Sequence, residues 1–259
     1  MDPKLLDPKP LEAASLDPAL THAIVDYLGR LRECRPLQER IECDAATAVV
    51  EAAGLPSHHD PQKNWDTFKC IAPIVAAGDL QAPILDAGAG VRVVAQRWLH
   101  QLGYGELYGC DLKPTVVKPA YASLGFKMSA QELTGTNYET GFFQAVTCIS
   151  VIEHGVELGG FAREMARILR PGGLLLVSTD YWSEPIDCTG IFPYGLEMGE
   201  MMIFNERGLR EFVETARGVG LEPVGEVSYG TGDRAVRWDR VDREYTFAFI
   251  ALRKTRSRP

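Results

Sequence analysis

Hydrophobic and polar positions divide the chain into two parts with different periodicities. From Ala19 to Ala53, apolar residues recur at the spacing of a helix face, which predicts helices. The stretch from Leu55 to Lys69 is mostly polar and is expected to be a loop, followed by a short helix that ends near Gly78. From about residue 80 onward, short apolar runs alternate with amphipathic stretches, as strands and helices in turn would produce.

Seven apolar runs in the second part predict seven strands. Helix-like stretches separate the first five, which favours parallel pairing and right-handed crossovers. Only a charged loop separates the last two, so they are expected to pair antiparallel. The runs are 83–87, 106–111, 126–130, 142–152, 174–180, 221–229 and 244–254. The pattern therefore predicts an α/β fold: residues 1–79 as an N-terminal arm and helical cap, and 80–259 as a Rossmann-like domain with an antiparallel last strand.

Two glycines mark the turn after the first strand. Gly88 and Gly90 allow a tight backbone turn and the close approach of a ligand, and the helix expected from Val91 would direct free N–H groups at that turn. This is a nucleotide-type binding device, although a plain strand-to-helix turn would also use such glycines. The dinucleotide fingerprint needs a third glycine where this chain has Val93, which argues against NAD. Asp111 ends the second strand, where a carboxylate can accept two hydrogen bonds from a ribose diol.

Composition narrows the classes of partner. The net charge of -8 disfavours nucleic acid and anionic membranes as partners. The six cysteines are scattered without a C-x-x-C pair, which indicates free thiols in a reducing compartment. No apolar run approaches the roughly 20 residues of a membrane span, and the proline-punctuated, acidic start is unlike a secretory signal. We therefore expect a cytoplasmic protein.

Four motifs, in order over residues 80–255, carry a family resemblance. They are "ILDAGAG", "YGCDL", "FFQAVTCISVIEH" and "LRPGGLLLVSTD". Together they resemble the class I S-adenosylmethionine-dependent methyltransferases, in the small-molecule branch similar to methyltransferase types 11 and 12. The resemblance implies a seven-stranded Rossmann-like sheet and S-adenosyl-L-methionine as the cofactor.

The same resemblance assigns expected roles to individual residues. Gly88 and Gly90 would lie against the methionine part of the cofactor, Asp111 would hold the ribose hydroxyls, and Leu112 would pack on the adenine. Asp86 would organise the turn, while Arg92 would either meet the methionine carboxylate or point to solvent. The remaining cofactor contacts expected from the resemblance are Ala87, Ala130, Gln131 and Ser150.

The acceptor is expected beyond the carboxyl ends of the fourth and fifth strands, where ligands bind in such sheets. His154 and Asp180 are the candidate general bases, with strand-end packing as the alternative for His154. Some relatives hold a divalent ion with two glutamates and a histidine, but Ser150 replaces the first glutamate here, so we expect no metal. The segment of about 181–204 is expected to be a lid. Three residues of this lid are candidates for lining the acceptor site: Tyr181, Trp182 and Tyr194. Trp65 of the cap is a fourth.

The sequence thus predicts methyl transfer to an oxygen or nitrogen of a small metabolite, such as a sugar, a phenolic or quinone precursor, or a secondary metabolite. The alternatives are an NAD-dependent oxidoreductase and a non-catalytic cofactor-binding subunit. The oligomeric state stays open, with a homodimer as one option.

Overall fold

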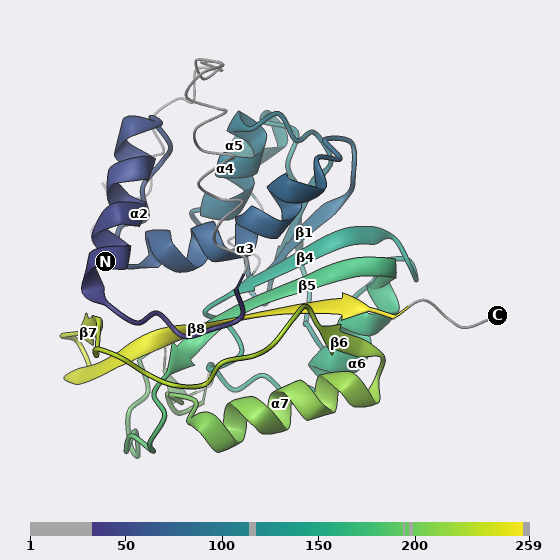
Figure 1. Ribbon diagram of the computed structural model, residues 1–259. Coiled ribbons are helices and arrows are strands. Elements are labelled where there is room, and N and C mark those ends of the chain that lie inside the picture. The colour runs from purple at the N-terminus through teal and green to yellow at the C-terminus, as the bar shows by residue number, and fades with distance from the viewer. Residues whose placement is uncertain (1–32, 114–117, 194, 197–198, 256–259) are drawn as a thin grey trace.

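The computed structural model describes residues 33–113, 118–193, 195–196 and 199–255 (Figure 1). Its centre is a twisted eight-stranded sheet with helices on both faces. The α/β class and the Rossmann-like architecture expected from the sequence are confirmed.

The strand order is β3-β2-β1-β4-β5-β8-β6, with β7 paired to β8 off this path. The five strands β1 to β5 are parallel, and β8 runs antiparallel to both β5 and β6, as expected from the missing helix near the end of the chain. The short β7 was not expected; it forms in the charged loop and pairs with the start of β8. The strands are β1 (Ile84–Ala87), β2 (Leu107–Asp111), β3 (Lys127–Ala130), β4 (Phe143–Ile149), β5 (Leu169–Tyr181), β6 (Leu221–Pro223), β7 (Val236–Trp238) and β8 (Arg243–Lys254).

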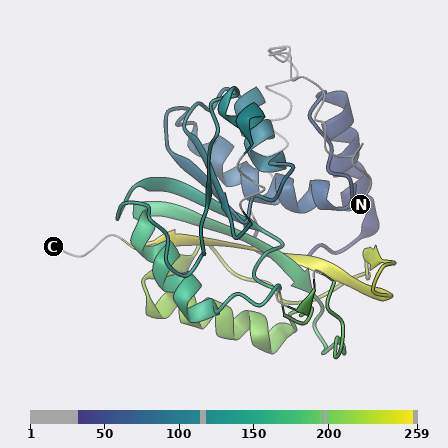
Figure 2. The ribbon, with the colours of Figure 1, turned by 180° about the vertical axis from the view of Figure 1, so that it is seen from behind.

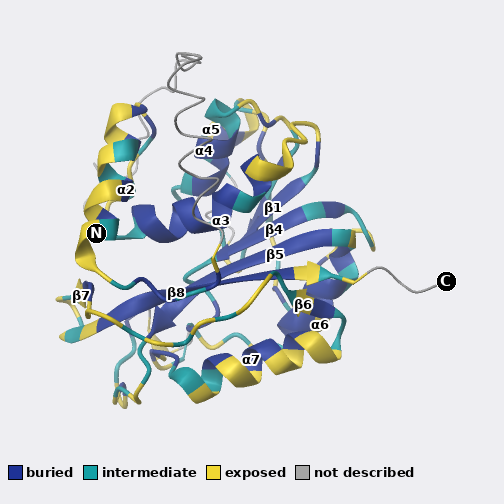
Figure 3. Cartoon of the chain, in the orientation of Figure 1, coloured by how far each residue is buried: buried dark blue, intermediate teal, exposed yellow. Residues whose placement is uncertain are grey.

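Helices cover the two faces unequally. One face carries α2 (Arg40–Ala52), α3 (Lys63–Ala77), α4 (Val94–Gln101) and α5 (Pro119–Ala122), and the other carries α6 (Leu158–Ile168) and α7 (Glu206–Gly218), as Figures 1 and 2 show. The central strands are buried, whereas the outer faces of α2 and α7 are exposed (Figure 3). Alternate residues of β5 serve the two cores: Leu176 packs on the α3 side and Val177 on the α6 side.

The helix α3 corrects the expected loop over 55–69. It starts at Lys63, and its polar residues Asn64, Asp66, Thr67 and Lys69 are all buried. Burial of these side chains against partners elsewhere in the chain hides the amphipathic pattern by which a helix is recognised. The end of the helix is as expected, because Gly78 adopts the left-handed conformation (φ 69°) that stops helices.

Other boundaries also differ from expectation, among them the starts of α4 and β5 and the end of β6, which stops at Pro223. The helix α4 begins at Val94, because Val93 has left-handed torsion angles (φ 46°, ψ 45°) that exclude it from the helix. The strand β5 begins at Leu169, so that Arg170 to Gly173 belong to the strand, with a register irregularity opposite β4.

The chain ahead of α2 lies along β8. The amide of Leu37 donates to the carbonyl of Phe247 at 2.8 Å, and Pro36 forms a bridge with Ala248. Further along, the amide of Ala251 donates to Sγ of Cys34 at 3.2 Å. The cap is therefore joined to the last strand of the sheet as well as to its face.

Candidate functional site

The turn after β1 leaves no room for a side chain at Gly88. Gly88 has φ 82° and Gly90 has φ 59°, torsion angles that glycine adopts without strain. A Cβ atom on Gly88 would lie 2.8 Å from Cγ1 of Val151 and closer still to Cγ2. The amides of Gly88 and Ala89 both donate to the carbonyl of Cys110 on β2. The turn is thus held between the ends of β2 and β4.

The carboxylate of Asp111 faces this turn. Its Oδ2 accepts a hydrogen bond from the amide of Gly90 at 3.2 Å, and its Oδ1 accepts one from the amide of Lys113 at 3.1 Å. Each carboxylate oxygen retains a further lone pair. Leu112, beside it, is 54% exposed, an apolar surface next to an anchored carboxylate. This pairing offers a ribose diol an acceptor and an adenine ring an apolar face.

The end of β3 borders Asp111. The amide of Gln131 donates to the carbonyl of Asp111 at 2.9 Å, and Ala130 pairs with Asp111 in the parallel ladder. The side chain of Gln131 is committed locally: its Nε2 donates to Ser129 and its Oε1 accepts from the amide of Asn137. Gln131 therefore borders the expected adenine position with its backbone.

Asp86 lies beneath the turn, on β1. Its Oδ1 accepts a hydrogen bond from Thr147 of β4 at 2.7 Å. Burial raises the pKa of the Asp86 carboxyl to about 7, although the bond from Thr147 opposes this. The side chain of Ala87 belongs to the core on the opposite face of the sheet, so this residue borders the turn with its backbone only.

The loop between α2 and α3 brings basic groups towards the turn. Burial first, and then the charge of Lys63, lowers the pKa of His58 to about 3. Burial and the charge of Arg92 lower the pKa of His59. Both imidazoles are therefore neutral at pH 7, and Arg92 and Lys63 carry the positive charge here.

A second group of polar side chains lies next to the turn, at the ends of β4 and β5. We call it the Lys63 cluster; its members are Lys63, Asp66, Ser150, Glu153 and Asp180. Asp66 and Glu153 are fully buried, Asp180 is 3% exposed, and the side chain of Lys63 is 23% exposed. The cluster adjoins the turn because Ser150 precedes Val151, the residue that contacts Gly88.

Ser150 is the centre of this cluster and has a strained backbone. Its φ of 51° is unusual for a residue other than glycine. Its amide donates to the carbonyl of Ser178 at 3.0 Å, and its Oγ accepts from Nζ of Lys63 at 2.5 Å and donates to Oδ2 of Asp66 at 3.3 Å. Contacts from α3 and β5 therefore maintain the left-handed conformation.

The three carboxyl groups of the cluster have few partners. Oδ2 of Asp66 also accepts from Oγ of Ser178 at 3.2 Å and lies 3.7 Å from Nζ of Lys63. Oε2 of Glu153 accepts from Oγ1 of Thr179 at 2.9 Å. Among the described residues, neither Oδ1 of Asp66 nor Oε1 of Glu153 has a hydrogen-bond partner. Buried carboxylate oxygens without partners are costly and are typical of sites that bind a ligand.

Burial sets the protonation of these groups. It raises the pKa of Glu153 and of Asp180 to about 7, and in Asp180 the nearby Glu153 adds to the effect. Burial also raises the pKa of Asp66. For Lys63, burial alone would lower the pKa, but the charges of Asp66, Asp180 and Glu153 outweigh it and raise the pKa. Lys63 is thus an ammonium among three carboxyl groups.

His154 follows Glu153 in the same loop. Its amide donates to the carbonyl of Val151 at 3.0 Å. Burial lowers the pKa of its imidazole, while the charge of Asp180 opposes that change. The ring is therefore neutral at pH 7, which is the form that accepts a proton. Sequence reasoning identified His154 and Asp180 but missed Asp66, whose only signal is its i,i+3 spacing from Lys63 in a stretch expected to be a loop.

Residues 85–177 match the family model described as "Methyltransferase domain". They include the Gly88 turn, Asp111 and the end of β4, and stop three residues before Asp180. Residues 85–177 therefore form a methyltransferase domain. Curated relatives include the ubiquinone biosynthesis O-methyltransferases of Xanthomonas oryzae pv. oryzae strain PXO99A (31% identical over 105 residues, 38% of this chain and 43% of the relative). The enzyme of the same name from Methylocella silvestris is 33% identical over 104 residues, covering 37% of this chain and 39% of the relative. The chain thus spans less than half the length of these curated relatives.

Solved structures share the fold of the methyltransferase domain. A geranyl diphosphate methyltransferase in complex with SAM has a TM-score of 0.57 at 16% identity, over 81% of this chain and 90% of that chain. A putative sarcosine dimethylglycine methyltransferase from Galdieria sulphuraria has a TM-score of 0.56 at 15% identity, over 90% of this chain and 98% of that chain. The family uses S-adenosylmethionine as its cofactor.

The four acceptor-lining candidates of the methyltransferase domain lie in different environments. The ring of Trp182 is partly buried and carries the guanidinium of Arg234 at 4.6 Å from its centroid. Trp65 is 1% exposed, and its Nε1 donates to Glu42 of α2 at 3.3 Å, so it packs inside the cap. Lys63, two residues earlier, and Asp66, one residue later, are the α3 residues that bond Ser150. Tyr194 lies outside the described residues.

Tyr181 points away from Asp180, because neighbouring residues of a strand face opposite sides. It is fully buried in the core under α7, and its hydroxyl donates to the carbonyl of Tyr229 at 2.7 Å. The side chain therefore lies on the opposite face of the sheet from the Lys63 cluster, which removes the geometric basis for an acceptor contact.

Tyr181→Phe should therefore lower the free energy of unfolding by about 1 kcal/mol, because it leaves a partly buried carbonyl without its donor. The affinity for S-adenosylhomocysteine should not change. Urea unfolding and calorimetric titration measure the two quantities. An altered affinity at unchanged stability would return Tyr181 to the binding site.

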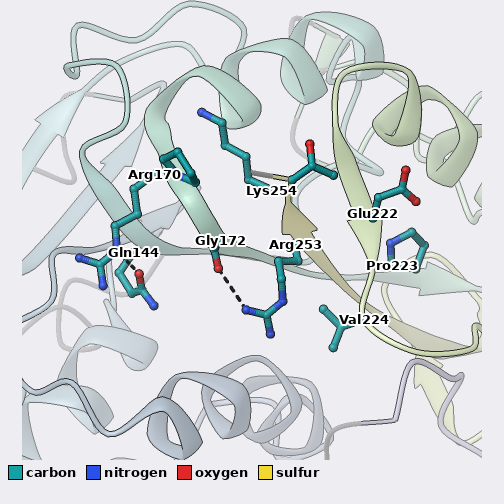
Figure 4. Close-up of a pocket in the computed structure, with 10 residues that line it drawn as sticks. Gln144, Arg170, Gly172, Glu222, Pro223, Val224, Arg253 and Lys254 are labelled. Carbon is teal, nitrogen blue, oxygen red and sulfur yellow. Dashed lines mark hydrogen bonds between the residues drawn. The ribbon is translucent and has the colours of Figure 1, made fainter. Parts of the chain in front are cut away.

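Apart from this site, the methyltransferase domain has a cavity of about 580 Å³ at the amino ends of β4 and β5. Figure 4 shows Gln144, Arg170, Arg253 and Lys254 around it, with Arg253 bonded to the carbonyl of Gly172. It lies at the edge of the sheet opposite Ser150, whereas class I sheets bind ligands beyond the carboxyl ends of their strands. The cavity and the candidate site therefore lie at opposite ends of the parallel strands.

The described part of the chain contains neither a grouped set of metal ligands nor a membrane-spanning helix. In the described ranges, no three side chains of the histidine, cysteine, aspartate or glutamate type are grouped so that they could hold a metal ion. Of the helices that the structure describes, none has the length and apolar character to cross a membrane.

Proposed function

We propose that this chain transfers a methyl group from S-adenosylmethionine to an oxygen or nitrogen atom of a small metabolite. The observation that carries the proposal is the common edge of the sheet, where the Gly88 turn and the Asp111 carboxylate adjoin a buried polar cluster. The turn and the Asp111 carboxylate suit a cofactor that has a ribose and no phosphate. The polar cluster suits the binding of the group that is methylated.

The fit to the cofactor comes from the chain's own geometry. Gly88 and Gly90 place no side chains of their own on the turn, and Asp111 has lone pairs left for two ribose hydroxyls. Leu112 would cover the adenine. Arg92 would meet the methionine carboxylate, because it is cationic and lies in the turn after β1. When bound, the cofactor supplies a methyl group on a positively charged sulfur.

The residues at the ends of β4 and β5 would position the acceptor and take its proton. Methyl transfer needs an acceptor aligned with the sulfur–methyl bond and shielded from water. Neutral His154, and Glu153 and Asp180 with pKa values raised to about 7, can each accept a proton near neutral pH. Trp182 would form part of the acceptor's surroundings.

Asp111→Asn and Asp111→Ala test the cofactor site. Each should weaken S-adenosylhomocysteine binding, the alanine variant by about 1–3 kcal/mol, because a charge-assisted pair of hydrogen bonds is lost. That range corresponds to about 5- to 150-fold in Kd. Calorimetric titration measures the affinity, and the melting temperature of each variant confirms folding.

Asp44→Ala is the matched control, because Asp44 is an exposed aspartate on α2 of the cap and not part of the turn after β1. It should bind S-adenosylhomocysteine as the wild type does. Unchanged affinity in folded Asp111→Ala would refute the assignment of the ribose site. Saturable binding of NAD with none of S-adenosylhomocysteine would refute the proposed function itself.

A further inference from the structure

We propose that the methyl acceptor is a small amine, bound as its ammonium ion by the Lys63 cluster. The inference rests on the proposed function and names its substrate class. The observation behind it is an excess of buried carboxyl groups over cations at the ends of β4 and β5, with an aromatic ring already in contact with an ammonium group.

The charges of the cluster do not balance. Asp66, Glu153 and Asp180 are each at least 97% buried, yet among the described residues only Lys63 places a side-chain ammonium between them. Other titratable groups nearby are His154, which is neutral, Tyr245, which shares a hydrogen bond with Asp180, and Asp60, which adds negative charge. The buried thiols of Cys70 and Cys148 lie near Asp66 and Glu153, and burial keeps both thiols protonated by raising their pKa. Buried charges are normally paired, so the surplus of carboxyl groups requires either protons or a cationic ligand.

Unused oxygen atoms point to the same conclusion. Oδ1 of Asp66 and Oε1 of Glu153 have no donor among the described residues, although both side chains are fully buried. An ammonium group carries up to three N–H donors and no acceptor, which matches a set of unpaired carboxylate oxygens. A carboxylate or phosphate acceptor would add negative charge, and a neutral alcohol would leave the imbalance in place.

An aromatic wall completes the site. Nζ of Lys63 lies 4.5 Å from the ring centroid of Phe247 on β8. Tyr245, two residues earlier on the same strand, faces Asp180. Aromatic faces attract cations, and the contact of Lys63 shows that an ammonium is compatible with this part of the protein. A second ammonium on the Glu153 and Asp180 side would have carboxylates and aromatic rings around it.

The chemistry balances with these groups and the cofactor. An ammonium R–NH₃⁺ gives one proton to the carboxylate of Glu153 or Asp180 and becomes the amine R–NH₂. The nitrogen lone pair forms the new N–CH₃ bond while the sulfur–methyl bond breaks, and its electron pair stays on sulfur. The products are R–NH₂⁺–CH₃ and S-adenosylhomocysteine, and the carboxylic acid releases its proton to solvent. Carboxyl groups with pKa values near 7 suit such a transfer.

Matched pairs of acceptors test the inference. The full chain is incubated with S-adenosylmethionine and benzylamine, benzyl alcohol, ethanolamine or ethylene glycol, and S-adenosylhomocysteine and the methylated product are quantified by mass spectrometry. The melting temperature of the S-adenosylhomocysteine complex is measured with the same compounds. We expect the amines to raise the melting temperature and to be N-methylated, at least tenfold faster than their alcohol partners react.

Glu153→Gln and Asp180→Asn remove one charge each with little change of shape. Each should raise the KM for benzylamine at least tenfold and leave the Kd of S-adenosylhomocysteine within threefold of the wild type. Glu226→Gln, on the exposed loop after β6, is the matched control and should change neither value.

The outcomes separate the inference from the proposed function. The amine assignment would be overturned if an alcohol were methylated and the matched amine were not, or if the amines neither bound nor reacted. In both cases the binding of the cofactor would be unaffected. Equal KM values for benzylamine in the wild type and in both folded variants would overturn the role of the cluster. Absence of S-adenosylhomocysteine binding would instead overturn the proposed function.

Discussion

Gly88→Ala should lower the free energy of unfolding by about 2–5 kcal/mol and abolish measurable binding of S-adenosylhomocysteine. The left-handed φ of 82° costs an alanine about 1–2 kcal/mol. Its Cβ would also lie 2.8 Å from Cγ1 of Val151, a branched side chain next to the backbone that cannot rotate clear, and such overpacking costs about 1–3 kcal/mol. Denaturant unfolding and calorimetric titration measure the two effects.

Gly90→Ala is the matched control for this result. Its φ of 59° imposes the same kind of backbone cost, but no atom lies within 4 Å of an added Cβ. It should therefore lose only about 1–2 kcal/mol of unfolding free energy. The double variant Gly88→Ala with Val151→Ala should recover most of the difference between the two glycine variants. Equal stability losses at Gly88 and Gly90 would contradict the contact between the turn and the loop after β4.

Lys63→Met should lower the free energy of unfolding by about 3–5 kcal/mol at pH 8, because it leaves the buried Asp66 without its cation. It also removes the hydrogen bond to Ser150, whose left-handed backbone depends on its neighbours. Denaturant unfolding at several pH values measures the loss.

The pH dependence identifies the cause of that loss. Burial raises the pKa of Asp66, Glu153 and Asp180 above their values in the unfolded chain, so these groups contribute stability that is lost as the pH rises through the folded pKa. In Lys63→Met the ammonium is absent, so the pKa values of these three carboxyl groups in the folded protein rise further. The deficit of Lys63→Met should therefore shrink between pH 8 and pH 5.5, and a deficit independent of pH would show that packing alone is lost.

Lys113→Met provides the comparison, since Lys113 is an exposed lysine at the end of β2. Its stability should stay within about 0.5 kcal/mol of the wild type at every pH, as for other surface changes.

The fold was largely predictable, because its main signals are local. Apolar runs between helix-like stretches identified β1 to β5, and the missing helix before β8 predicted its antiparallel direction. The sequence missed the first half of α3 because Asp66 is buried against Ser150 and Ser178, which lie 84 and 112 residues away along the chain. A polar residue whose partners are so distant looks the same as a solvent-exposed one.

The candidate site was predictable only where a motif fixes a backbone position. Gly88, Gly90 and Asp111 lie where their motifs placed them, around one turn. Tyr181 and Asp180 were grouped because they are adjacent, although the alternation of a strand already separates them onto opposite faces. Asp66 and Lys63 could not be assigned, because their roles arise from packing of the cap on the sheet.

The contacts of Cys34, Pro36 and Leu37 with β8 have a consequence for how this molecule unfolds. The segment ahead of α2 is hydrogen-bonded to β8, which lies almost at the other end of the chain. Neither this segment nor β8 retains its full set of hydrogen bonds without the other. Loss of structure at either end should therefore spread through both, and the molecule should melt in a single cooperative transition.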